Sequence, residues 1–298
     1  MSGSVVAVVN MKGGVGKTSI VVGLAETLAA SRDKPAVLVM DMDAQASASY
    51  CIAGNEVLTG LINQRKTVDE FYSAALVNGP KFSLRDLIQR PATSVTLGGV
   101  NLDVGLVASS VDLRMTEREI IFELTEKGYS LRAIEGQATE LLRRELVQIR
   151  KEFEFIIIDC APGISAFTDA ALRNADLVIV PTIPDFISHA GLAAFIGRVL
   201  QEQRSQKVVQ TGRQPYVLIS KKKGTRHHAE YSNLIRKHAS NTNSGFRVFN
   251  CEIPETSDFP KALERAEDNN IPTYHNKYGT NLVLTLTQLA LEVRSALQ

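Results

Sequence analysis

The sequence contains few cysteines. Cys51, Cys160 and Cys251 are widely spaced, and none of them forms a Cys-x-x-Cys pair. This pattern excludes a zinc knuckle, a redox dithiol and a conventional iron–sulfur ligand set. A sparse, odd number of cysteines is also typical of proteins in a reducing cytosol.

Long apolar runs are missing as well. No apolar stretch approaches the roughly 20 residues that span a bilayer. The apolar run Val5–Val9 is too short for a signal peptide and has no basic residue before it. Because hydrophobic residues make up 44% of the 298 residues, we expect a folded chain rather than a disordered one. These observations predict a soluble, cytoplasmic protein with no membrane partner.

The sequence has almost no net charge. Thirty-three lysines and arginines oppose thirty-two aspartates and glutamates, which gives +1. This total predicts neither a nucleic-acid binder nor a membrane binder. Residues 198–237, however, hold ten lysines and arginines and two glutamates, a local charge of +8. The balanced total therefore hides a polarised distribution of charge.

Short apolar runs rich in β-branched residues predict the strands of a sheet. The five clearest are Val5–Val9, Ala36–Met40, Phe155–Ile158, Leu177–Val180 and Tyr216–Ile219. Continuous apolar runs are typical of parallel strands that are covered on both faces. Between the first two runs, Ile20, Leu24 and Leu28 recur at helical spacing. We therefore predict an α/β fold with a doubly wound, mostly parallel sheet and helices on both faces.

The rest of the chain gives weaker signals. Strands are expected at Leu102–Val107 and near Phe246–Cys251, and helices at Thr139–Arg150 and Asn281–Leu297. Residues 79–99 contain two prolines and several turn-forming residues, so we expect an irregular segment there.

A glycine-rich segment follows the first predicted strand. It consists of Met11-Lys12-Gly13-Gly14-Val15-Gly16-Lys17-Thr18. Glycines let the backbone fold tightly around phosphate oxygens, and the helix that starts near Lys17 directs its positive end at the same anion. In such a loop Lys17 reaches the β- and γ-phosphates, and the Thr18 hydroxyl is placed to ligate Mg²⁺. The segment predicts a nucleoside triphosphate site.

Carboxylates follow two of the other predicted strands. Asp41 and Asp43 follow the second run, and Asp159 follows the run Phe155–Ile158. In a doubly wound sheet, the carboxyl ends of the strands face the phosphate site. A hydrophobic strand that ends in aspartate is the Walker B arrangement, in which the carboxylate accepts from Mg²⁺-bound water.

The glycine-rich segment departs from the strict P-loop pattern, because Met11 stands where its first glycine would be. It matches the variant K-G-G-x-G-K-[ST] and so resembles the deviant Walker A ATPases, the ParA/MinD superfamily. The run after the second strand resembles the D-x-D-P-Q switch of ParA proteins, with Ala44 in place of the proline. The run after Asp159 resembles D-C-P-P, with Ala161 in place of the first proline.

The resemblance covers most of the chain and is weakest at residues 55–101. It also includes Ile253-Pro254 after a late strand. The chain departs from the superfamily's Ser-Arg-Gly-Ala run near the C-terminus, where it has Lys277–Thr280. We interpret residues 1–298 as a single P-loop ATPase domain with a divergent excursion at about 55–101.

The resemblance implies an ATP hydrolase that uses ATP and Mg²⁺ and forms a homodimer in ATP. Catalytic roles fall on Lys12, Lys17 and Asp43: Lys12 would cross to the nucleotide of the partner subunit, and Asp43 would orient the attacking water. Thr18 would contact Mg²⁺ directly, and Asp41, Asp43 and Asp159 through water. The implied nucleotide-binding residues are Lys12, Gly13, Gly14, Val15, Gly16, Lys17, Thr18, Ser19, Asp41, Asp159 and Pro254.

Members of this superfamily bind either membranes or DNA. A MinD-like membrane helix is basic and amphipathic, whereas Thr280–Gln298 has only Arg294 and Glu292 as charged residues, which argues against a membrane. ParA-like members bind DNA phosphates without sequence preference. They carry a basic loop where this chain has a basic run after Tyr216–Ile219. We predict DNA contacts at Lys221, Lys222, Lys223 and Arg226.

Two interpretations of this basic run stay open, because a charge run of this kind is also found as a solvated surface loop. The stretch Glu255–Asp258 is acidic where ParA proteins often carry an arginine. The leading hypothesis is a nucleoid-associated ParA-type ATPase that partitions or positions a plasmid, chromosome or other cargo with a ParB-like or other activating adaptor. The alternative is a ParA-like regulatory or scaffolding ATPase without DNA binding. A nitrogenase-reductase-like protein would need cysteines that this sequence lacks.

Overall fold

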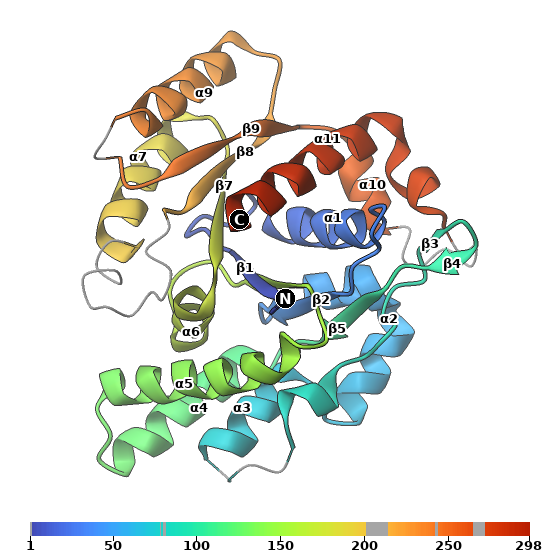
Figure 1. The fold of residues 1–298 in the computed structure, drawn as a ribbon. Helices are drawn as coiled ribbons and strands as arrows, with labels where there is room; N and C mark the ends of the chain where they lie inside the picture. Colours follow the sequence, from blue (N-terminus) through green and yellow to red (C-terminus); the bar gives the residue numbers. More distant parts are fainter. Residues whose placement is uncertain (1, 78, 80–81, 201–213, 242–243, 265–271) are drawn as a thin grey trace.

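The computed structural model describes residues 2–77, 79, 82–200, 214–241, 244–264 and 272–298 (Figure 1). Within this part of the chain, seven strands form one sheet in the order β5-β2-β6-β1-β7-β8-β9, and every neighbouring pair is parallel. Their bounds are β1 (Ser4–Val8), β2 (Val37–Met42), β5 (Val104–Val107), β6 (Phe155–Cys160), β7 (Leu177–Thr182), β8 (Tyr216–Lys222) and β9 (Arg247–Pro254).

Helices cover both faces of the sheet (Figure 1). One layer contains α1 (Lys17–Ala29), α2 (Ser47–Asn63), α10 (Asp258–Glu264) and α11 (Tyr274–Leu297). The other contains α3 (Val68–Leu76), α4 (Leu113–Glu126), α5 (Leu131–Ile149), α6 (Ala166–Asn174), α7 (Phe186–Ala194), the π-helical turn η2 (Phe195–Leu200) and α9 (Arg226–Ala239). The predicted fold class, a doubly wound parallel sheet between two helical layers, is confirmed.

The sheet separates two hydrophobic cores because successive side chains of a strand point to opposite faces. In β1, Val5 and Ala7 pack into the core under α3–α6, whereas Val6 and Val8 pack against α1 and α11. All four side chains are fully buried. This explains why the strands are continuously apolar in the sequence rather than alternating.

All seven predicted strands are present, with different ends. The second and third of the clear runs extend by two residues, through Met42 and Cys160. The polar residues Asp41 and Asp159 therefore belong to the strands, because their backbones pair with each other in the parallel ladder. The predicted helix at 139–150 is the second half of α5, which begins at Leu131.

The excursion at 55–101 holds mainly short elements. After α2 and α3 it contains the 3₁₀ turn η1 (Leu84–Leu87) and the hairpin of β3 (Thr96–Leu97) and β4 (Val100–Asn101). Gly98 and Gly99 join the two strands with φ values of 61° and 80°, which favour glycine in a two-residue hairpin. None of the described helices is long and apolar enough to span a membrane.

A buried ion pair ties the C-terminal helix to the helix that follows the glycine-rich segment. Lys277 of α11 places Nζ 2.8 Å from Oε1 of Glu26 in α1, and both side chains are at most 1% exposed. Tyr278 donates a hydrogen bond to Glu26 Oε2 and Thr93 donates one to Oε1. The carboxylate is thus satisfied by three partners, which fix α1 against α11 and the excursion.

We expect Lys277→Met to destabilise the fold by about 3–5 kcal/mol, because it leaves the Glu26 carboxylate buried without its cation. Urea unfolding measures the change. Adding Glu26→Gln to the same chain should recover much of the loss. As a matched control, Lys127→Met should have little effect, since its pair with Glu123 lies on the surface. A Lys277→Met loss no larger than the control's would contradict this role.

Candidate nucleotide-binding site

The loop between β1 and α1 has the backbone of a phosphate-binding turn. Gly14 and Gly16 have φ values of 73° and 88°, a region that only glycine enters without strain. Gly16 is the N-cap of α1, and no side chain caps this helix end. The amides of the first turn are therefore available to an anion, at the positive end of the helix.

The parallel register brings the predicted acidic residues to this loop. Val8, the last residue of β1, is aligned with Asp159 of β6, which is aligned in turn with Asp41 of β2. These three strands lie side by side in the sheet, so their carboxyl ends meet at one edge. Residues from three distant parts of the sequence thus surround the start of α1.

Asp159 is, like Asp41, a deeply buried acid of this edge. Its Oδ2 accepts a hydrogen bond of 2.7 Å from the Thr18 hydroxyl, whereas its buried Oδ1 has no hydrogen-bond partner in the described structure. Burial, and then the nearby Asp41 carboxylate, raise the pKa of Asp159 well above its usual range. Mg²⁺ binds oxygen ligands. The Thr18 hydroxyl and the Asp159 carboxylate, with its unpartnered Oδ1, therefore fit the predicted metal.

Lys17 is a buried cation that interacts electrostatically with Asp159 and Asp43. Its side chain is buried at the start of α1, and burial lowers its pKa, opposed by the charges of Asp159 and Asp43. The two carboxylates therefore favour the charged form of Lys17, against the effect of burial. The start of α1 is the position from which the P-loop lysine meets the β- and γ-phosphates.

Asp41 is held by hydrogen bonds on both oxygens. Oδ2 accepts from the Ser49 amide at 2.8 Å and from the Ser49 hydroxyl at 2.7 Å, and Oδ1 accepts from the Asp43 amide at 3.1 Å. The Ser49 hydroxyl also accepts from the Ser109 amide at 3.0 Å. Asp41 therefore joins the start of α2 to the end of β5, and burial raises its pKa to about 6.

Asp43 lies in the short loop between β2 and α2. Its Oδ1 accepts a hydrogen bond of 3.0 Å from the Gln45 amide, and the side chain is almost buried. The loop ends at Ala46, whose φ of 50° is left-handed. The charge of Asp43 acts on Lys17 and raises its pKa, while the role of Asp43 with the attacking water remains a prediction.

Lys12 reaches out of the glycine-rich segment toward α7. Its Nζ lies 3.3 Å from Asp185 Oδ2 and 3.0 Å from Ser188 Oγ. Asp185 also caps α7 by accepting from the Ser188 amide at 2.7 Å. The Lys12 side chain is 40% exposed. Lys12 thus lies at the rim of the site, away from the buried Lys17.

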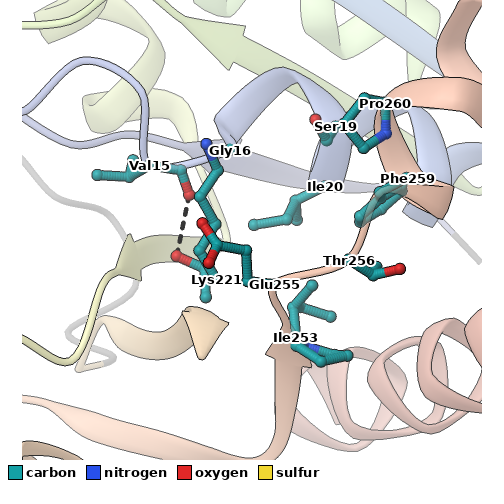
Figure 2. Close-up of a pocket in the computed structure, with 12 residues that line it drawn as sticks. Val15, Gly16, Ser19, Ile20, Lys221, Ile253, Glu255, Thr256, Phe259 and Pro260 are labelled. Atoms are coloured by element: carbon teal, nitrogen blue, oxygen red, sulfur yellow. Dashed lines mark hydrogen bonds between the residues drawn. The ribbon is translucent and has the colours of Figure 1, made fainter. Parts of the chain in front are cut away.

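A cavity of about 210 Å³ opens beside the P-loop (Figure 2). Val15, Gly16 and Lys221 lie on one side of it, and Phe259 and Pro260 on the other. The end of β9 completes the wall, and the lining also includes Ser19, Ile20, Ser220, Ile253, Pro254, Glu255 and Thr256. Four predicted nucleotide-binding residues therefore border one space, namely Val15, Gly16, Ser19 and Pro254.

Three of the four predicted DNA-contact residues form ion pairs with glutamates. Lys222 forms an ion pair with Glu252, Lys223 with Glu255 at 3.2 Å, and Arg226 with Glu230 at 2.9 Å.

Lys221 differs from these three cations, because it lines the cavity. The DNA contacts predicted at Lys221, Lys222, Lys223 and Arg226 remain a prediction. Of the wider basic segment, Arg204, Lys207 and Arg213 lie outside the described residues.

Several site residues were not predicted from the sequence. Ser49 lies eight residues after Asp41 on the next helix, and only the fold brings the two together. Asp185 and Ser188 have the spacing of a helix N-cap, a signal for a helix start rather than for a partner of Lys12. Ser220 ends an apolar run and carries no motif of its own.

The fold and the site together define an α/β nucleotide-binding protein of the P-loop class. Residues 3–210 match the family model described as AAA domain (AAA_31), about two thirds of the chain. The chain belongs to this family and is a P-loop ATPase of the ParA/MinD type.

Relatives with known roles share this part of the chain. The sporulation initiation inhibitor protein Soj of Bacillus subtilis is 28% identical over 202 residues, which are 68% of this chain and 67% of Soj. The chromosome partitioning protein ParA of Myxococcus xanthus is 28% identical over 191 residues, 64% of this chain and 56% of that protein. The alignments thus span only part of these relatives.

Solved structures share the fold over nearly the whole chain. A plasmid partition protein of Borrelia burgdorferi, bound to AMPPNP, superimposes with a TM-score of 0.69 at 18% identity. The match covers 98% of this chain and 99% of that one.

The hydrogen bonds from Ser49 to Asp41 should contribute to stability in a pH-dependent way. Ser49→Ala removes a hydrogen bond to the Asp41 carboxylate, and such a bond contributes about 1.5–3 kcal/mol when the acceptor is charged and about 1 kcal/mol when it is neutral. With the pKa of Asp41 raised to about 6, the acid is neutral at pH 5 and ionised at pH 8. The stability lost in Ser49→Ala should therefore be larger at pH 8.

Urea unfolding of both proteins at the two pH values gives this difference directly. The sign follows from linkage: a raised carboxyl pKa makes the folded state bind more protons between about pH 4 and 6, so Asp41 lowers stability as the pH rises. Removing a partner of the charged form increases that penalty. An equal loss at pH 5 and pH 8 would show that Ser49 does not act through the Asp41 charge.

Proposed function

We propose that this chain is a cytoplasmic, Mg-ATP-dependent ATPase of the ParA type that dimerises in ATP. We propose further that it binds nucleoid DNA without sequence preference and partitions or positions a plasmid, chromosome or other cargo, with a ParB-like or other adaptor as activator. The observation that carries the proposal is that Lys17 and Thr18, at the start of α1, meet Asp43 and Asp159 from the ends of β2 and β6. In this proposal residues 1–298 act as one ATPase domain, with the excursion at 55–101 as an addition to it.

The nucleotide would lie with its phosphates on the loop at Gly13–Thr18. The free amides of the α1 start and the Lys17 ammonium would meet the phosphate oxygens, and the cavity that ends at Pro254 would take the nucleoside. Thr18 would hold Mg²⁺ directly, with Asp159 accepting from its water. The ion would neutralise part of the negative charge of the phosphates.

Asp43 would orient the attacking water, since its carboxylate lies next to Lys17 and outside the buried pair with Thr18. Asp41 would position Asp43, because its carboxylate accepts hydrogen bonds from the Asp43 and Ser49 amides. Lys12 would break its ion pair with Asp185 and bind the phosphates of the partner subunit's nucleotide. A second lysine is of use there because Lys17 already serves the phosphates of its own chain.

DNA would be met by the surface part of the basic run. Lys223 and Arg226 are more than half exposed, and their glutamate partners are exposed too, so phosphates can compete for both cations. The ion pairs of Lys222 and Lys223 favour the second candidate function, a regulatory or scaffolding ATPase without DNA binding. Glu252 and Glu255 neutralise part of the charge that DNA would require.

Two variants should affect ATP hydrolysis and ATP binding separately. Asp43→Ala removes the carboxylate that orients water but leaves the phosphate loop intact, so we expect kcat to fall about 10²-fold or more, with ATP affinity nearly unchanged. Lys17→Ala should weaken ATP binding by several kcal/mol, because it removes charge-assisted hydrogen bonds of about 1.5–3 kcal/mol each. Calorimetry and phosphate release measure the two effects. Unchanged ATP affinity in Lys17→Ala would remove the basis of the proposal.

The DNA step is tested by the salt dependence of binding. Replacing Lys222, Lys223 and Arg226 by alanine should weaken all DNA sequences equally. It should also lower the slope of log K against log salt by about 0.9 for each phosphate that the variant no longer neutralises. A control with three exposed cations elsewhere, Lys66, Arg132 and Lys151, should keep the wild-type slope.

Binding of a duplex of random sequence in ATP, ADP and no nucleotide also decides between the two functions. The ParA-type proposal predicts tight binding in ATP alone, because a dimer presents two copies of the basic surface to one duplex. An absence of DNA binding in every nucleotide state would favour the scaffolding function.

A further inference from the structure

Lys221 has an unusual backbone conformation at the end of β8. Its φ is 50°, in the left-handed region that residues with a Cβ seldom adopt. Such strain persists where the surrounding structure requires it, and it is frequent at ligand sites. The strained residue is the first of three consecutive lysines, and the other two form ion pairs with Glu252 and Glu255.

The neighbouring residue fixes β8 to the P-loop. The buried Ser220 hydroxyl donates a hydrogen bond of 2.9 Å to the carbonyl oxygen of Val15, drawn as the dashed line in Figure 2. This bond brings the next residue of β8 to the loop. The Lys221 Cε lies 3.8 Å from the position that a Cβ on Gly16 would occupy. The aliphatic part of the side chain therefore lies over the N-cap of α1.

Lys221 is the one member of the three consecutive lysines that borders the cavity. It lines the cavity together with Gly16, Ser19 and Pro254, and its side chain is half-buried. Among the ion pairs of the described residues, none includes Lys221. Glu255 also borders the cavity, but its carboxylate pairs with Lys223 at 3.2 Å. A lysine that lies over a phosphate-binding turn without an anionic partner is suited to an anionic ligand.

We propose that Lys221 binds the phosphate chain of the nucleotide in its own subunit, from the β8 side of the P-loop. Lys17 approaches the same phosphates from the buried side, next to Asp159. The inference rests on the proposed ATP site, and it removes Lys221 from the DNA-contact residues. A cation at this place favours nucleotides that carry phosphates over the free nucleoside.

The test uses Lys221→Asn, because asparagine tolerates left-handed φ and carries no charge. Calorimetry should show ADP and ATP bound about ten- to a hundredfold more weakly than by the wild type, with Lys221→Arg restoring affinity to within about threefold. Lys223→Asn, the matched control two residues away, should keep wild-type nucleotide affinity. In hydrolysis, Lys221→Asn should raise KM more than it lowers kcat.

DNA binding gives the opposite pattern for the same two variants. Lys223→Asn should lower the salt slope by about 0.9, and Lys221→Asn should leave it unchanged. Wild-type nucleotide affinity in a folded Lys221→Asn would overturn the inference, and a lowered salt slope in that variant would place Lys221 on the DNA surface. If Lys221→Asn does not fold, Lys221→Gly is measured in its place, since glycine relieves the strained φ.

Failure of this inference is distinguishable from failure of the proposed function. If wild type binds ATP and Lys17→Ala does not, the site is established and Lys221→Asn tests Lys221 alone. If the wild type binds neither ATP nor ADP, both the proposed function and the inference are wrong.

Discussion

The parallel register of three neighbouring strands is the constraint on which the site depends. Asp41 and Asp159 are aligned across β2 and β6, and Val8 is aligned with Asp159 across β1 and β6. A shift of one residue in either pairing would turn an acid toward one of the apolar cores. The continuous burial of these strands, packed from both faces, fixes the register, so the fold's stability and the site's geometry have the same origin.

The site concentrates charge where a protein interior tolerates little. Asp41 and Asp159 are fully or almost fully buried, and the buried Lys17 lies near them. Burial raises the pKa of both acids and lowers that of the lysine, which means that holding all three in place lowers the stability of the fold. Such an arrangement is typical of functional sites, where a bound ion and phosphates complete the balance of charge.

The sequence was sufficient for the sheet and the phosphate loop, because both depend on local patterns. Runs rich in β-branched residues predict five of the seven strands clearly, and weaker signals predict β5 and β9. Gly13–Thr18 predicts the turn between β1 and α1. Contacts between distant residues could not be predicted in this way. The buried pair of Glu26 and Lys277 joins residues 251 positions apart, and the left-handed backbone of Lys221 is not evident in a run of three lysines. Helix α4 was missed because only three of its residues are buried.

In the proposed function, two chains share each nucleotide through Lys12. This sharing is tested most directly by the ATPase rate of an equimolar mixture of Lys12→Ala and Asp43→Ala proteins, combined before ATP is added. Each protein alone should be inactive, but in a mixed dimer the Asp43→Ala chain supplies Lys12 to the intact site of the other. With random pairing about a quarter of all sites are then complete, so the mixture should reach about a quarter of the wild-type rate. A rate equal to the average of the two separate proteins would show that Lys12 does not act across a dimer.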